Sequence, residues 1–75
     1  MRPIHPKRLQ QLKNSFAPGT RVRLLYMNDP YTKLSSGELG TVIGVDDIGT
    51  IHVSWDCGSS LGVAYGEDSC EIVKD

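Results

Sequence analysis

The stretch Thr50-Ile51-His52-Val53-Ser54-Trp55-Asp56 decides the fold class of this 75-residue chain. Apolar Ile51, Val53 and Trp55 alternate with polar residues, and a period of two is typical of a strand with one buried and one wet face. We expect Trp55 to be the largest core side chain, with one partner for its indole N–H. The chain therefore contains at least one half-buried β-strand.

Four further segments around this strand have the composition of short strands separated by turns. Residues 20–26 alternate apolar and polar residues, and residues 40–45 resume strand composition with Gly44 placed as a bulge. Residues 61–65 and 70–73 follow as two more apolar segments. Because closure removes exposed strand edges, a chain of this length favours a mainly β fold, a small five-stranded SH3-like barrel.

The alternation also assigns side chains to faces. We expect one inward face on the first strand and one shared face on the fourth: Val22, Leu24 and Tyr26 on the former, and Leu61, Val63 and Tyr65 on the latter.

A short α-helix precedes the first strand. Pro6 suits the first turn of a helix, and Leu9, Leu12 and Phe16 recur at three- and four-residue spacing along one face. About eleven residues form a marginal helix alone. This apolar stripe should therefore dock on the barrel or on a partner.

The charge of the chain divides where this helix ends. Residues 1–19 carry four basic and no acidic residues, whereas residues 20–75 carry four basic and nine acidic ones. We therefore separate a basic N-terminal arm with its short helix, residues 1–19, from an acidic barrel, residues 20–75. Binding to nucleic acid depends largely on Lys and Arg, and six basic residues could form one stripe for it: Arg2, Lys7, Arg8, Lys13, Arg21 and Arg23.

The sequence favours neither a membrane-spanning protein nor a small domain held together by disulfides. No apolar run approaches the roughly 20 residues that cross a bilayer, and residues 1–8 lack the apolar stretch of a signal peptide. The sequence predicts a cytoplasmic protein with no membrane partner. Two cysteines, Cys57 and Cys70, are too few for a disulfide scaffold and match no zinc spacing, even with His52. We interpret them as part-buried thiols and expect no metal site and no cofactor.

The sequence predicts no enzyme. His52, Ser54 and Asp56 form one outward row, but side chains two apart on a strand point in parallel, and no nucleophile turn or oxyanion site accompanies them. The acidic pairs Asp46-Asp47 and Glu67-Asp68 lie beside glycines, where Asp commonly bonds its own backbone. We interpret these pairs as turn formers.

The long segment from Met27 to Gly37 is the first candidate for a partner surface. It has turn chemistry at both ends, and a loop of this length inside a compact domain is often functional. Aromatic residues on the loops of such a barrel can form a groove for peptide or unpaired bases. The candidate partner-binding residues lie in or near this loop and at the end of the fourth strand: Tyr26, Met27, Asp29, Tyr31, Lys33 and Tyr65.

Four stretches of the chain resemble a bacterial family of small domains of unknown function, the DUF4314 family: Phe16–Val22, Met27–Tyr31, Val45–Val53 and Trp55–Gly62. Separately, the succession Gly37–Val42, Asp46–Gly49 and Ile51–Gly58 is similar to the hairpin of the second and third strands in many SH3-like barrels. The family resemblance covers roughly residues 15–72. The family resemblance implies a genomic context, because family members occur in Firmicutes and on mobile elements such as conjugative transposons and phages. It implies no active site.

Two functions stay open. The leading hypothesis is a non-catalytic binding module, a protein-interaction or accessory factor associated with a mobile element, one form of which antagonises a host defence complex. The alternative is a nucleic-acid-binding barrel that uses the basic helix with Arg21 and Arg23. A third interpretation is an accessory domain beside a larger neighbour, and an exposed Leu9/Leu12/Phe16 stripe would support it.

Overall fold

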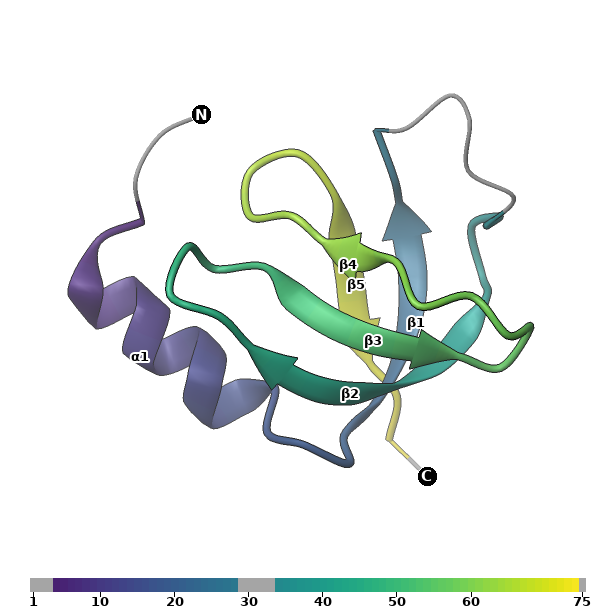
Figure 1. Cartoon of the computed structure of the whole chain (residues 1–75), viewed down its shortest axis with the longest axis horizontal. Coiled ribbons are helices and arrows are strands. Elements are labelled where there is room, and N and C mark those ends of the chain that lie inside the picture. Colours follow the sequence, from purple (N-terminus) through teal and green to yellow (C-terminus); the bar gives the residue numbers. More distant parts are fainter. Residues whose placement is uncertain (1–3, 29–33, 75) are drawn as a thin grey trace.

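A computed structural model describes residues 4–28 and 34–74 (Figure 1). The one helix and five strands predicted for this part of the chain form in the expected order, with ends shifted by one or two residues. Their bounds are α1 Pro6–Ser15, β1 Arg21–Tyr26, β2 Leu39–Val45, β3 Ile51–Trp55, β4 Gly62–Val63 and β5 Ser69–Ile72.

The five strands form one antiparallel sheet in the order β4-β3-β2-β1-β5. This confirms the mainly β, barrel-like fold with a short N-terminal helix. Strand pairing does not close the sheet, however, because β4 and β5 each pair on one side only. The expected loss of both edges is therefore wrong, and the edge of β5 stays unpaired among the described residues.

The β2–β3 hairpin contains the centre of the core. Ile51, Val53 and Trp55 are buried while His52 and Ser54 are exposed, as the alternation predicts. The pairing register shifts between Val42 and Gly44, which confirms the bulge. At the turn, the Asp46 carboxylate accepts hydrogen bonds from the amides of Ile48 at 3.2 Å and Thr50 at 2.9 Å. Asp46 is therefore the turn former that the sequence predicts.

Close packing leaves space only for glycine at the β2 position that pairs with Trp55. Gly40 pairs with Trp55, and a Cβ at Gly40 would lie 2.6 Å from Val53 Cγ1 and 2.8 Å from Trp55 Cε3. Trp55 is 2% exposed, and its indole N–H donates to the Leu61 carbonyl at 2.9 Å. This confirms Trp55 as a core side chain with one hydrogen-bond partner.

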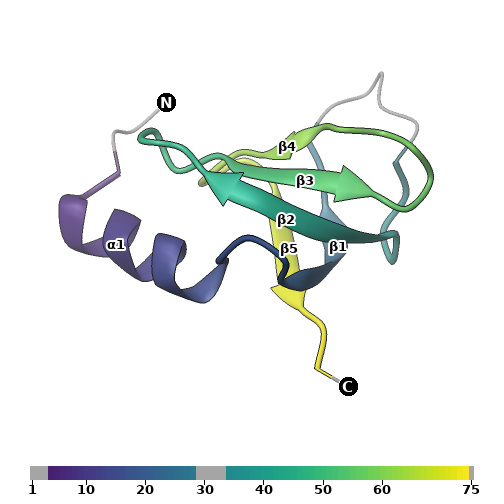
Figure 2. The same cartoon turned by 60° about the horizontal axis from the view of Figure 1, so that its bottom comes forward.

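Helix α1 docks on the barrel. Leu12 is buried, Leu9 is half-buried and Phe16 packs against the core cluster. The Lys13 ammonium pairs with Asp47 of the β2–β3 turn at 3.0 Å. Figures 1 and 2 both place α1 beside the C-terminal end of β2. Because the stripe packs on the barrel of its own chain, it is not the exposed stripe that would support an accessory domain beside a larger neighbour.

Four predicted side-chain placements are wrong, those of Tyr26, Leu61, Tyr65 and Cys57. Tyr26 is 56% exposed rather than inward-facing, because the β1–β5 register shifts between Leu24 and Tyr26. Leu61 and Tyr65 are exposed while Val63 is buried, since β4 consists of Gly62 and Val63 only: Leu61 precedes the strand and Tyr65 lies in the turn after it. Cys57 is exposed, outside the core, on the β3–β4 connection.

No helix among the described residues is long and apolar enough to span a bilayer.

Candidate functional site

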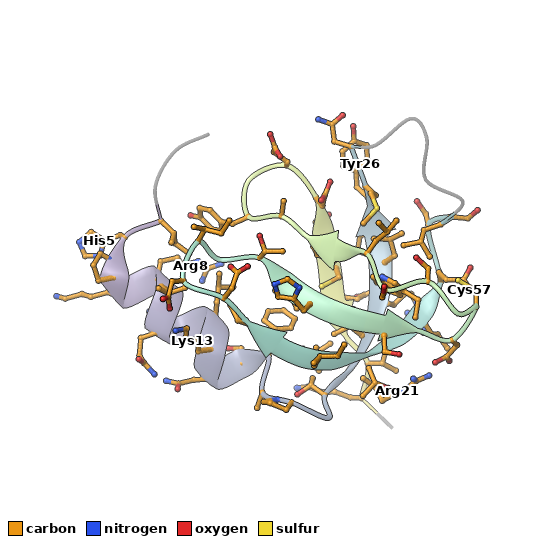
Figure 3. All side chains as sticks on the ribbon, in the orientation of Figure 1. His5, Arg8, Lys13, Arg21, Tyr26 and Cys57 are labelled. Atoms are coloured by element: carbon orange, nitrogen blue, oxygen red, sulfur yellow. The ribbon has the colours of Figure 1, made fainter. Side chains whose placement is uncertain are left out.

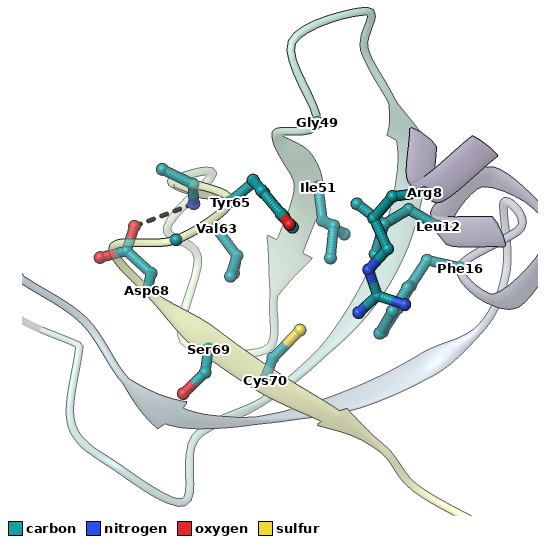
Figure 4. Close-up of a pocket in the computed structure, with 12 residues that line it drawn as sticks. Arg8, Leu12, Phe16, Gly49, Ile51, Val63, Tyr65, Asp68, Ser69 and Cys70 are labelled. Atoms are coloured by element: carbon teal, nitrogen blue, oxygen red, sulfur yellow. Dashed lines mark hydrogen bonds between the residues drawn. The ribbon is translucent and has the colours of Figure 1, made fainter. Parts of the chain in front are cut away.

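A half-open pocket of about 260 Å³ lies between α1, the start of β3, the β4–β5 turn and β5. Its walls include the apolar side chains of Leu12, Phe16, Ile51 and Val63 (Figure 4). Arg8, Tyr65 and Cys70 add a guanidinium, a phenol ring and a thiol to the lining. The pocket occupies the gap that the unclosed sheet leaves beside β5.

Asp68 holds the wall that carries Tyr65. One carboxylate oxygen accepts a hydrogen bond from the Ala64 amide at 2.9 Å, drawn as a dashed line in Figure 4, and the other accepts one from the Asn28 amide at 2.7 Å. The Asp68 amide in turn donates to the Ala64 carbonyl at 2.9 Å. The β4–β5 turn is thus fixed on itself and to the end of β1. This bears out the prediction that Asp68 forms a turn.

The Cys70 thiol points into the pocket (Figure 4). Burial raises the pKa of this thiol to about 11, so it stays protonated at neutral pH. It therefore acts as an apolar wall with a weak donor rather than as a nucleophile. Cys70 and Cys57 are both free, and the prediction of a part-buried thiol is confirmed for Cys70 only.

Arg8 reaches the pocket from α1 without an acidic partner. Its guanidinium makes one long hydrogen bond, 3.4 Å, to the Gln11 side chain. Among the described residues no carboxylate lies within ion-pair distance of Arg8. An unpaired guanidinium beside apolar walls can bind a carboxylate through charge-assisted hydrogen bonds.

A family model described as Domain of unknown function (DUF4314) matches residues 5–73 of the chain. The chain belongs to the DUF4314 family. The matched region extends from the start of α1 past the end of β5, so all of the pocket lies within the DUF4314 domain. The comparisons with curated proteins and with solved structures found no match.

The DUF4314 domain does not gather its basic candidates into one stripe. Arg8 and Lys13 lie on α1, whereas Arg21 lies on a different side of the molecule (Figure 3). Arg21 forms a two-point ion pair with Asp56 at 2.9 and 2.7 Å, and Arg23 pairs with Glu71 at 3.3 Å. The hydrogen bond from Arg21 lowers the pKa of Asp56 below its ordinary value. Lys7 is exposed on α1, and Arg2 lies outside the described residues.

The partner-binding candidates also separate. Tyr65 lines the pocket, Tyr26 is exposed at the end of β1 without lining it, and Met27 packs partly against the core. The other three candidates, Asp29, Tyr31 and Lys33, lie outside the described residues. The described structure therefore singles out Tyr65 from this set.

The outward row that begins on β3 is divided between two separate side-chain contacts. His52 Nε2 lies 2.8 Å from the Asp46 carboxylate, whereas Asp56 pairs with Arg21. Partial burial tends to raise the pKa of Asp46, but hydrogen bonds from His52, Thr50 and Ile48 together lower it. Within residues 4–28 and 34–74, no three His, Cys, Asp or Glu side chains gather as metal ligands would.

Sequence reasoning missed the pocket, although it contained one signal for it. Arg8 lies four residues before Leu12 and eight before Phe16, so the three share one helix face. A face that docks Leu12 and Phe16 must bring Arg8 to the barrel. The remaining lining residues come from strands and turns whose approach depends on the unclosed sheet.

Proposed function

We propose that this DUF4314 domain is a non-catalytic module that binds another protein, and that the pocket between α1 and β5 is its recognition site. The half-open pocket with apolar walls carries this proposal. Clefts that take an anchoring side chain of a partner are typical centres of protein interfaces. Tyr65, 38% exposed at its margin, is the kind of aromatic residue that interfaces enrich.

The size of the pocket supports a protein partner over a cofactor or metabolite. Sites for small molecules usually measure about 300–1,000 Å³ and enclose most of their ligand. A pocket of about 260 Å³ that is open on one side falls below this range. It suits one or two side chains of a larger partner.

The ion pairs of the basic residues make nucleic acid the weaker candidate. Lys13, Arg21 and Arg23 each pair with a carboxylate, and the negative charge beside each cation offsets part of its attraction for phosphate. Nucleic-acid binding through the basic helix stays a prediction. It expects affinity for an oligonucleotide at low salt that falls steeply as salt rises.

A matched pair of tyrosine variants tests the protein-binding proposal. The purified domain is immobilised, and proteins retained from an extract of a related bacterial host are compared for wild type, Tyr65→Ala and Tyr26→Ala. We expect retention to fall at least about tenfold for Tyr65→Ala and to be unchanged for Tyr26→Ala. Equal retention by all three would exclude the pocket, and the absence of any specific protein would contradict the proposed function.

The two cysteines give a second readout of the same complex. Labelling of Cys70 by a thiol reagent is slow in the free domain, because burial keeps the thiol protonated; bound partner should slow it further, since Cys70 lines the pocket, and should leave the labelling rate of the exposed Cys57 unchanged. Protection of Cys57 alone would place the interface at the β3–β4 connection instead.

Cytoplasmic location and association with a mobile element belong to this proposal and rest on the sequence and the family resemblance. On this view the bound protein is a host factor, such as a component of a defence complex. Neighbouring genes for conjugation, replication or phage functions are expected. A uniform housekeeping neighbourhood would contradict the association.

A further inference from the structure

The pocket and the unpaired edge of β5 beside it are together called the α1–β5 groove. We infer that this groove binds an extended peptide segment of the partner, which pairs with β5 as an additional strand. One of its apolar side chains fills the pocket, and one of its carboxylates binds Arg8. This inference rests on the proposed function, because it specifies what the pocket recognises. Three independent features of the described residues carry it.

The first feature is the free edge of β5. The Val73 amide donates to the Arg21 carbonyl, and Arg23 pairs with Glu71, so alternate residues of β5 bond to β1. The backbone groups of Cys70 and Ile72 therefore point away from β1. Among the described residues no backbone hydrogen bond reaches them from outside the sheet. An unpaired edge of this kind is a template for an added strand.

The second feature is the position of the pocket relative to this edge. Cys70 lies opposite buried Leu24, so its side chain is on the inner face, and it lines the pocket. In paired strands, residues directly opposite each other have their side chains on the same face. A peptide residue paired with Cys70 would therefore direct its side chain into the pocket. An aliphatic side chain matches walls such as Ile51 and Val63.

The third feature is the charge of Arg8. It extends from α1 to the same pocket and has no acidic partner among the described residues. A peptide between α1 and β5 would have one border on Arg8 and the other on the backbone of β5 (Figure 4). An Asp or Glu beside the apolar anchor complements this guanidinium.

The other sheet edge does not offer the same site. Strand β4 has two residues, and the next backbone amide, that of Ala64, is already bonded to the Asp68 carboxylate. The four-residue edge of β5 can form a longer ladder. This difference selects β5 for an incoming strand.

A random heptapeptide display library, selected against the purified domain, tests the inference directly. We expect the enriched peptides to share an aliphatic residue and an acidic residue at one fixed spacing. Enrichment of basic or proline-rich peptides, or of none, would overturn the inference.

Backbone methylation of the best peptide tests strand pairing without changing the protein. N-methyl groups placed one residue at a time should alternate in effect, because only every second amide of an added strand faces β5. We expect at least about tenfold weaker binding at the facing positions and little change at the others, since a lost hydrogen bond together with the methyl clash costs about a factor of ten. A flat profile would contradict strand addition.

Charge reversal on α1 tests the role of Arg8. Arg8→Glu should weaken binding of the acidic peptide by about tenfold or more, and a peptide with Lys in place of its acid should recover affinity for this variant. Lys7→Glu is the matched control, since Lys7 is exposed on the same helix and does not line the pocket. Equal weakening by both substitutions would indicate general attraction and overturn the specific contact.

Three outcomes separate this inference from the function on which it rests. Peptide binding that Tyr65→Ala abolishes, but that shows no N-methyl alternation and no Arg8 effect, overturns the inference and leaves the pocket as a protein-binding site. If the wild-type domain binds neither a peptide nor a host protein, both the inference and the proposed function are overturned. Concentration-dependent dimers of the free domain that the peptide does not dissociate would assign the β5 edge to a second copy, which also overturns it.

Discussion

The β2–β3 hairpin and the α1–β5 groove differ in whether their packing space, polar groups and charges have partners within the domain. In the hairpin, Gly40 leaves no space for a side chain, Trp55 has a partner for its indole N–H, and His52 on the outer face contacts the Asp46 carboxylate of the turn. No buried side-chain nitrogen or oxygen among the described residues lacks a partner. The groove instead combines an unfilled pocket, a cation without an acid and a strand edge without a strand. The comparison indicates that the β2–β3 hairpin maintains the fold, whereas the α1–β5 groove has groups available to bind a partner.

The largest expected effect comes from Gly40→Ala, which forces an atom into the closed region. The new Cβ would meet side-chain and backbone atoms of β3 at 2.6 to 3.0 Å, so the hairpin must separate. Overpacking of this kind costs about 3 kcal/mol, which corresponds to a fall in melting temperature of more than about 10 °C for a domain of this size. Thermal unfolding followed by far-UV circular dichroism measures it.

Gly44→Ala is the control for this substitution. Gly44 lies in the same strand, but nothing stands within 4 Å of a Cβ placed there. Its free energy of unfolding should change by less than about 0.5 kcal/mol. Similar destabilisation by both variants would mean that strand glycine itself, rather than close packing, is required.

A smaller loss of stability is expected from a substitution in the β4–β5 turn, which forms one wall of the pocket. Asp68→Ala removes the acceptor of two backbone amides, those of Ala64 and Asn28. The unpaired amides should cost about 2 kcal/mol of unfolding free energy. Urea denaturation measures this cost, and Glu67→Ala next to it should have almost none. If Asp68→Ala is as stable as wild type, the wall of the pocket does not depend on this carboxylate.

The smallest effect concerns two carboxylates of the outer face, those of Asp46 and Asp56, in acid. Asp46 and Asp56 have pKa values below the ordinary 3.8 in the folded protein. Their contribution to stability is therefore complete above that value and is lost as the pH falls through and below it. We expect the urea midpoint to decrease slightly between about pH 6 and pH 3, because exposed pairs contribute little. Asp46→Asn and Asp56→Asn should each reduce this pH dependence, and an unchanged dependence would contradict the assignment.

The arrangement of elements along the chain was predictable because it depends on local patterns. Alternation predicts β3, turn chemistry predicts the Asp46 and Asp68 turns, and helical spacing predicts the docked face of α1. These signals come from residues a few positions apart, which is the range over which side-chain periodicity operates. Residues in these elements therefore lie close to where the sequence places them.

The open edge, the exposed Tyr26 and the pocket were not predictable in the same way. Each depends on the register between strands that are far apart in the chain, such as β1 with β5. A shift of register between Leu24 and Tyr26 reverses the direction of the tyrosine without any change in its local pattern. The pocket combines α1 with residues near the C-terminus, and only the Arg8 spacing pointed to it.

The environment of Trp55 gives the domain an internal optical reporter. The chain has one tryptophan, and its hydrogen bond to Leu61 connects the end of β3 to the segment before β4. A buried indole emits at shorter wavelengths than an indole in water, so the emission maximum reports whether the hairpin is folded. Trp55 does not line the pocket. Its emission should therefore separate variants that unfold from variants that fold but no longer bind, with no added label.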